Sequence, residues 1–348
     1  MKKNTLIVAL KIAVTLLFVF LLIQHLDGME LMDTLAGVDL TYLLLGFAFS
    51  FALIAVSCWK WWYILRCQDC AIPFPTLYRW YFIGYFYTNF LPSNVGGDVA
   101  RAWLVARRHQ SGSAALISVF AERFTGSLVL LGLALVMPFT AATGLWRLPS
   151  VWMIMGGAAG LLACLLLLIR FGAAGARSAW MAGWMRGLQR LLRADRPGRL
   201  ARLWAQVDAK GRTLADKAGR LLAVLRRNPR AAWTIFGLTL LFYAMTVVNV
   251  LLAYRAFGVW ADAGAVAAVL PIALMVGMIP VTLGNLGITE GAYVFYFGLA
   301  GLPRELTLAM SLFLRLKVLT MGAIGLIVHL REGAKPPAEG VPAVQGDG

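Results

Sequence analysis

Long apolar runs alternate with short polar stretches along the chain. A helix needs about 20 consecutive apolar residues to cross the hydrocarbon core of a membrane. Runs near this length predict six transmembrane helices, at residues 5–23, 40–65, 114–139, 151–169, 231–254 and 306–330. The pattern therefore predicts an all-α, polytopic membrane protein.

Two further apolar segments, 76–108 and 263–301, are interrupted by residues that break helices. The first contains TNFLPSNVGGDVAR and the second contains IPVTLGNLGITE, so each break holds a proline, glycines and an acid. Unpaired backbone inside a membrane is tolerated only within protein or beside a water-filled cavity. Each segment is therefore predicted to form a broken, re-entrant helical hairpin, and the two breaks point to a binding site.

The two breaks also share a spacing, because Pro92 precedes Gly96 by four residues and Pro280 precedes Gly284 by four. Three predicted spans separate the hairpins. One hairpin is therefore expected to enter from the cytoplasmic face and the other from the outer face. This is the arrangement of an inverted repeat, in which substrate lies near the midplane between two discontinuous elements.

Composition and charge place the protein in the membrane. Of its 348 residues, 60% are hydrophobic and 14% are charged, against about 25% charged in soluble proteins. The formal net charge of +16 is the excess that the positive-inside rule produces, which we favour over nucleic-acid binding. Lys2 and Lys3 precede the first span and Lys11 lies in its N-terminal half, whereas the loop after it has four acids and no Lys or Arg. We expect a bacterial inner (plasma) membrane protein with both termini in the cytoplasm.

Residues 1–332 are expected to form one transmembrane domain, followed by a short disordered tail at 333–348. Within the domain, 170–230 carries 15 of the 32 basic residues and only three acids. Its apolar positions recur with helical spacing, which predicts a basic, amphipathic cytoplasmic insertion. Two helices on the inner membrane surface and a solvated hairpin both fit this pattern.

Charged residues inside the first half are functional candidates, because charges in apolar segments are costly. Asp98 and Arg101 are three residues apart and share one helix face. Arg101 is expected either to contact a phosphate or to form a structural pair with Asp98. Glu122 and Arg123 are adjacent, so they point about 100° apart on a helix and need different partners.

The second half also carries charged residues inside its apolar segments. Glu290 is expected either to be stabilised at the start of a helix, with Thr289 as its cap, or to be a buried acid. As a buried acid it would bind a cation or a proton, or would pair with Arg315. Arg315 and Lys317 lie too deep in the last predicted span for easy snorkelling, so they need partners or a wet cavity.

Breaks and embedded charges together give one set of candidate substrate-binding residues. They are Asn89, Pro92, Gly96, Gly97, Asp98, Arg101, Glu122, Arg123, Pro280, Gly284, Gly287, Glu290, Arg315 and Lys317. We predict no metal site and no cofactor, because no hydrolase, metalloprotease or nucleotide-binding motif is present. The single C-x-x-C of Cys67 and Cys70 is weak evidence for metal or redox chemistry.

Four motifs in order, PSNVGGDVAR, AERF, PVTLGNLGITE and LRLK, give the chain a family resemblance over roughly residues 5–332. It resembles the membrane domain of the lysylphosphatidylglycerol synthase/flippase family. The chain departs from the family pattern at Gly284-Asn285, where Gly-Gly is usual, and at Thr125-Gly126, where an acid is usual. The resemblance implies a lipid-translocating unit without the soluble synthase domain of the fused members.

Three functions remain open from the sequence. The first is an inner-membrane lipid translocase for a phosphate- or sugar-bearing lipid, such as an anionic phospholipid or a polyprenyl-linked lipid. The second is a membrane-embedded glycosyltransferase or lipid-modifying enzyme, with Asp98 or Glu290 as base. The third is a non-transporting partner of a lipid-synthesis enzyme. Membrane lipids are the expected partners in each case, along with such an enzyme or a second copy of the chain, and no nucleic acid.

Overall fold

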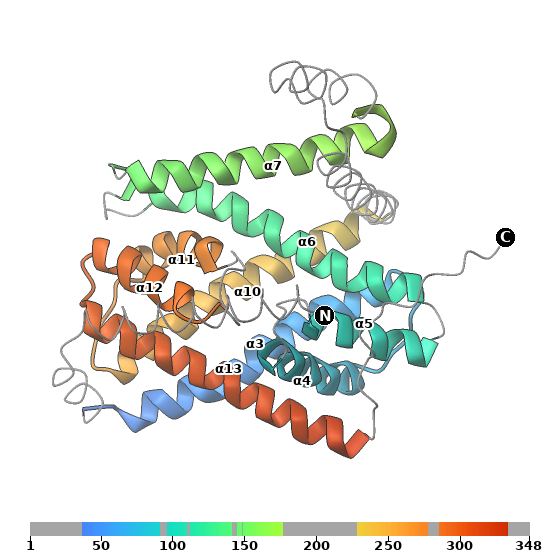
Figure 1. Cartoon of the computed structure of the whole chain (residues 1–348), viewed down its shortest axis with the longest axis horizontal. Helices are drawn as coiled ribbons and strands as arrows, with labels where there is room; N and C mark the ends of the chain where they lie inside the picture. The colour runs from blue at the N-terminus through green and yellow to red at the C-terminus, as the bar shows by residue number, and fades with distance from the viewer. Residues whose placement is uncertain are drawn as a thin grey trace, which may run out of the picture.

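Helices make up all the regular structure in the part of the chain that the structure describes (Figure 1). The structure is a computed structural model, and it describes residues 37–90, 96–109, 112–140, 145–147, 149–176, 228–277 and 285–332. Four helical stretches are long and apolar enough to cross a membrane: Leu40–Arg66 (α3), Ala114–Phe139 (most of α6 with the short helix η1), Pro229–Ala256 (α10) and Arg304–Glu332 (α13). The protein is therefore all-helical with several membrane-crossing elements, as predicted.

The remaining helices are shorter or less fully described. They are α4 (Phe74–Phe90), α5 (Gly96–His109), α6 as a whole (Gly112–Val136), η1 (Met137–Phe139), η2 (Leu145–Arg147), α7 (Pro149–Ala176), α11 (Ala263–Gly277) and α12 (Ile288–Leu299). The predicted span at 151–169 falls within α7, and the predicted span at 5–23 lies outside the described residues. The tail at 333–348 and most of the 170–230 insertion lie outside them too.

One order of helices occurs twice. A long helix, a hairpin of two short helices and a second long helix appear as α3, α4–α5, α6 and again as α10, α11–α12, α13. The distance along the chain from the first long helix to the hairpin is also the same in both halves. α3 and α4 begin 34 residues apart, and so do α10 and α11. The segments predicted as broken hairpins, 76–108 and 263–301, are these two helix pairs, and the two helices of each pair are in contact.

Equivalent helices of the two halves run in opposite directions. The backbone N–H of Asp39, at the start of α3, donates a 2.8 Å hydrogen bond to the carbonyl of Ala256, at the end of α10. The same Asp39 caps α3, because its carboxylate accepts from the backbone N–H of Thr41 at 2.8 Å. The hairpins accordingly lie toward opposite ends of the long helices (Figure 1).

Small residues let α4 approach its neighbours closely. The α carbon of Gly97 faces the Gly84 carbonyl and the Thr88 hydroxyl so tightly that a side chain would overlap both. Gly325 of α13 faces the Phe82 carbonyl in the same way. Close backbone approach of this kind is a common basis of helix packing in membranes. It fixes the first hairpin against α13.

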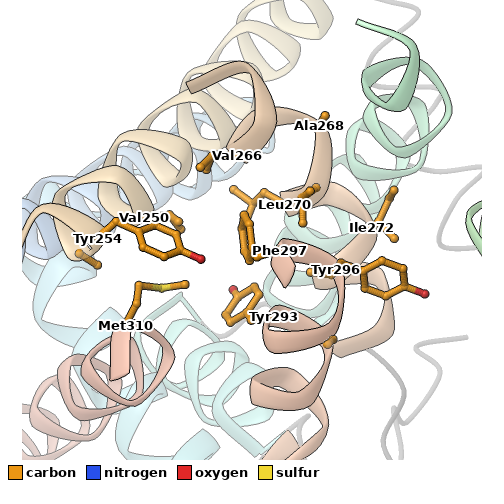
Figure 2. Packing of buried hydrophobic residues seen from close by; sticks show 14 of the residues in the cluster. Val250, Tyr254, Val266, Ala268, Leu270, Ile272, Tyr293, Tyr296, Phe297 and Met310 are labelled. Carbon is orange, nitrogen blue, oxygen red and sulfur yellow. The ribbon is translucent and has the colours of Figure 1, made fainter. Parts of the chain in front are cut away.

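Each hairpin has its own apolar core. The second hairpin packs between α10 and α13 through Tyr254, Phe297 and Met310, among others (Figure 2). The first hairpin packs against α3 and α6 through a separate cluster that includes Trp61 and Leu77. Among the described residues, the two largest apolar clusters are therefore centred one on each hairpin, and two smaller clusters join helices of both halves.

Exposed tryptophans lie near the ends of the long helices. Trp59 and Trp233 are exposed near the end of α3 and the start of α10, and Trp152 and Trp260 are exposed at the other side of the bundle. Aromatic side chains favour membrane–water interfaces. Trp61 lies two residues after Trp59 and is buried, where its indole N–H donates to the Ser118 hydroxyl at 3.1 Å.

Candidate functional site

The ends of the two hairpins meet the long helix α13 at its middle. Asn89, near the end of α4, donates a 2.9 Å hydrogen bond to the carbonyl of Val318, which is the central residue of α13. Glu290, in the first turn of α12, pairs with Arg315, which is three residues away along α13, or about 4.5 Å of rise. The described residues beside both breaks, Asn89 and Glu290, therefore lie at the mid-height of the bundle.

In the first half, Arg101 is the centre of a closed network. Its Nη2 donates to the Asp98 carboxylate at 2.7 Å and its Nη1 to the Glu122 carboxylate at 2.8 Å. The Tyr81 hydroxyl donates to the other Glu122 oxygen at 2.6 Å. The guanidinium also lies over the rings of Tyr81 and Trp61, at 4.4 and 5.0 Å from their centroids. Arg101 is fully buried, and the structural pair expected with Asp98 is present, with Glu122 as a second partner.

Arg123 has a different environment. Its Nε and Nη2 each donate to the Asp98 carboxylate at 2.9 Å, so Glu122 and Arg123 have different partners, as predicted. The Arg123 side chain nevertheless keeps 60% of its surface exposed. It does not point away from the bundle, since its partner Asp98 lies on the hairpin helix α5.

Lys60 completes the first cluster and was missed by sequence reasoning. Its Nζ donates to the backbone carbonyl of Glu122 at 3.2 Å, and the side chain is buried. The surrounding run WKWW is typical of an interfacial belt, which is why the residue was not singled out. A signal was present, because Lys60 lies six residues before the end of a long apolar helix.

In the second half, Glu290 serves both roles that the sequence left open. One carboxylate oxygen accepts from the backbone N–H of Gly287 at 2.7 Å, and the other pairs with the Arg315 guanidinium at 2.7 Å. Arg315 also donates to the Asn285 carbonyl at 3.3 Å. The predicted cap Thr289 is wrong, because the helix begins at Ile288 and its N-cap is Gly287. The backbone φ of 86° at Gly287 explains why a glycine is needed there.

Lys317 is held by neutral groups. Its Nζ donates to the side-chain oxygen of Asn249 at 2.6 Å and to the backbone carbonyl of Gly46 at 3.2 Å. The side chain is buried, so Lys317 does not snorkel to a membrane surface. Asn249 was another residue that the sequence did not mark.

The two clusters share a register. Asp98 and Glu290 are each the third residue of the returning hairpin helix, α5 or α12. Arg123 and Arg315 are each the twelfth residue of the following long helix, α6 or α13. Each acid therefore pairs with an arginine 25 residues later in the chain. The same acid–arginine pair occupies the same place in both halves.

The remaining candidates add little to the clusters. Gly96 and Gly97 begin α5, and Pro92, Pro280 and Gly284 lie outside the described residues. Among the described residues, no three His, Cys, Asp or Glu side chains are grouped as a metal site requires. Cys67 and Cys70 are free thiols. Burial raises the pKa of both, which disfavours the reactive thiolate.

Comparison with known proteins supplies the family. Residues 8–325 match the family described as the lysylphosphatidylglycerol synthase TM region. The chain belongs to this family. Two proteins of Methanothermobacter thermautotrophicus, each described as a UPF0104 membrane protein, are both 22% identical to the chain. One aligns over 87% of each chain, and the other aligns over 82% of this chain and 84% of its own. The family and the long apolar helices together make this a multi-pass membrane protein.

Proposed function

We propose that the protein is a lipid translocase of the inner membrane that moves a phosphate- or sugar-bearing lipid between leaflets. The position of the two acid–arginine pairs supports the proposal most directly. Both lie at the mid-height of long apolar helices, where a charge is costly and marks a substrate or ion pathway. Membership of the lysylphosphatidylglycerol synthase TM family supports the same interpretation.

The two halves are proposed to form an inverted repeat. Six spans would then cross the membrane, with both termini and the basic insertion in the cytoplasm. The hairpins α4–α5 and α11–α12 would dip into the membrane from opposite faces. Their broken ends at mid-height are the arrangement in which transporters hold substrate between discontinuous helices. The antiparallel α3 and α10 support this topology.

The charges of the two clusters favour an anionic headgroup. Counted formally, the first cluster has three cations (Lys60, Arg101 and Arg123) and two acids (Asp98 and Glu122), which leaves one positive charge in excess. In the second half, Arg315 and Glu290 balance each other. The further cation Lys317 is held by neutral groups of α3 and α10. A lipid phosphate that enters would neutralise a charge that the membrane interior otherwise penalises.

Transport in reconstituted vesicles tests the proposal. Purified protein is placed in vesicles that carry fluorescent phosphatidylglycerol, phosphatidylcholine or a polyprenyl phosphate, and leaflet exchange is followed by quenching from outside. We expect exchange of an anionic lipid above that of protein-free vesicles. Correctly folded protein that moves none of these lipids would contradict a translocase. Formation of a new lipid product from an added sugar donor would favour an enzyme instead.

Accessibility of single cysteines tests the orientation. Asp33→Cys and Gly211→Cys, in a background without the native cysteines, lie in the predicted outer loop and cytoplasmic insertion. An impermeant thiol reagent added to intact cells should label only the first. Equal labelling of both positions would overturn the topology.

A further inference from the structure

We propose that Arg123 and Arg315 are two binding sites, here called stations, that the anionic group of one lipid occupies in succession. In this structure the Arg123 station is open and the Arg315 station is covered. The inference rests on the proposed lipid transport and adds which side chains the substrate contacts, and in which order. It follows from the shared register of the two clusters and from the difference in their exposure.

The two arginines occupy equivalent positions in the two halves. Each is the twelfth residue of the long helix that follows a hairpin, and each holds an acid in the first turn of the returning hairpin helix. The helices that carry the two sites run in opposite directions within the two halves. A site repeated in this way faces one side of the bundle in one half and the opposite side in the other.

The side chains of the two sites differ in how much of their surface is exposed in this structure. The Arg123 side chain is 60% exposed and that of its partner Asp98 is 16% exposed. The corresponding values are 20% for Arg315 and 5% for Glu290. The two sites thus occupy equal positions in the fold and differ in how far solvent reaches them. One site is accessible while its counterpart is covered, which is what alternating access requires.

Arg123 is also able to exchange its partner. It holds Asp98 through the edge formed by Nε and Nη2, and an arginine edge binds a phosphate with two parallel hydrogen bonds in the same way. Asp98 would not be left unpaired by this exchange, because Arg101 still donates to it at 2.7 Å. Leaving a buried carboxylate without a partner is the main cost of breaking such a pair, and here that cost is avoided.

Arg101 is therefore a positioning residue and not a station. Both of its terminal nitrogens are already used by Asp98 and Glu122, and its side chain is 3% exposed. Tyr81 and Trp61 lie against its guanidinium. An incoming phosphate would have to displace carboxylates and rings together to reach it, whereas Arg123 needs to release only one carboxylate.

The test separates binding from transport with charge-conserving variants. Arg123→Lys and Arg315→Lys keep the positive charge and the pair with the acid but lose the two-point geometry for phosphate. Arg79→Lys is a matched control, because Arg79 is also exposed and paired with an acid, Glu332, but lies at the far end of α4. Binding of short-chain phosphatidic acid to the purified full chain is measured by native mass spectrometry, with short-chain diacylglycerol, which carries no phosphate, as the comparison.

We expect Arg123→Lys to weaken phosphatidic acid binding about tenfold, as the loss of one strong hydrogen bond would. Arg315→Lys and Arg79→Lys should bind like the unaltered protein, because the covered station is not used in the resting state. In the vesicle assay, Arg123→Lys and Arg315→Lys should both reduce exchange of anionic lipid to about a tenth, and Arg79→Lys should not. Arg123→Gln provides a second variant of the exposed site if the lysine variant aggregates.

The outcomes distinguish the inference from the proposed function. If the unaltered protein moves anionic lipid but the two lysine variants change binding equally, or Arg315→Lys transports normally, the two-station inference is overturned and the translocase stands. If the unaltered protein moves no lipid, the translocase itself is overturned. Loss of binding only in Arg123→Lys, with loss of transport in both, supports the two stations.

Discussion

The two hairpins have the same backbone plan and different side chains inside it. At matching helix positions, Tyr81, Arg101 and Glu122 of the first half correspond to Leu270, Tyr293 and Leu314 of the second. The first set forms a hydrogen-bonded ionic network. The second set lies in or against the apolar core that Figure 2 shows. The same arrangement of helices can therefore enclose either a buried ionic network or ordinary apolar packing.

The contrast indicates which charges the fold needs. The pair between the first turn of the returning helix and the next long helix is present in both halves, as Asp98–Arg123 and Glu290–Arg315. At the Arg101–Glu122 positions, the second half has Tyr293 and Leu314 instead. Replacing a buried ion pair with well-packed apolar residues is often neutral or stabilising. The first hairpin therefore keeps its network for a reason besides folding, which is consistent with a role in positioning Asp98.

Arg101→Tyr should have the largest effect on stability. The change removes the arginine partner of buried Glu122 and leaves the Tyr81 hydroxyl donating to it, and breaking a buried pair on one side costs about 3–5 kcal/mol. Adding Tyr81→Leu and Glu122→Leu reproduces the side chains of the second half and should restore most of the loss. The free energy of unfolding in mixed micelles, from detergent titration, measures both.

A triple variant that is no more stable than Arg101→Tyr alone would mean that the two hairpins are not equivalent in packing. The same variants should lose anionic lipid exchange even where stability returns. Without Arg101, Asp98 has only Arg123 as its arginine partner, so Arg123 cannot release it for a lipid phosphate without leaving Asp98 unpaired. Recovery of both stability and transport would remove any positioning role for Arg101.

Tyr81→Phe is expected to have the next largest effect. The change removes a hydrogen bond to a carboxylate, and bonds to charged groups contribute about 1.5–3 kcal/mol. For comparison, Tyr254→Phe on α10 of the second half removes a 2.8 Å bond to the neutral hydroxyl of Thr307. This should cost only about 0.5–1.5 kcal/mol. Detergent titration compares the two directly. Equal losses would indicate that the bond to the Glu122 carboxylate is no stronger than a bond to a neutral hydroxyl.

Much of this arrangement could be predicted from the sequence, because helix breakers inside apolar runs interrupt a helix wherever they occur in a membrane. Pro, Gly and acid clusters located both hairpins, and the long apolar runs located α3, α6, α10 and α13. The separate partners of Glu122 and Arg123 followed from the 100° turn between adjacent helical residues. These predictions depend on local periodicity alone.

The rest depended on contacts between distant segments. Lys60 lies in a run that is typical of an interfacial belt, and only the approach of α6 makes it part of the cluster. Asn249 carries no charge, so nothing in its own helix marks it as the partner of Lys317. The 25-residue spacing of both acid–arginine pairs was present in the sequence, but spacing alone does not say which acid meets which arginine.

Gly97→Ala should have an intermediate effect that is specific to the first hairpin. A methyl group there would overlap the Gly84 carbonyl and the Thr88 hydroxyl, and overpacking of this kind costs about 1–3 kcal/mol. In the second hairpin, Gly291→Ala places its methyl group in open space. It should be neutral or stabilise the helix by up to about 1 kcal/mol. Thermal unfolding followed by circular dichroism in detergent measures both, and a similar result for the two would mean that α5 does not pack this closely on α4.

Arg79→Gln should have the smallest effect on stability. It tests whether an acid–arginine pair outside the two clusters contributes to stability or to transport. Arg79 and Glu332 join the first hairpin to α13 at 3.6 Å, but both side chains reach solvent. Pairs of this kind contribute about 0–1 kcal/mol, and salt screens them. We expect an unfolding free energy within this range of the unaltered protein, converging with it at high salt, and normal lipid exchange. A large, salt-insensitive loss would show that the contact between the halves, and not the embedded pairs, dominates the stability of the bundle.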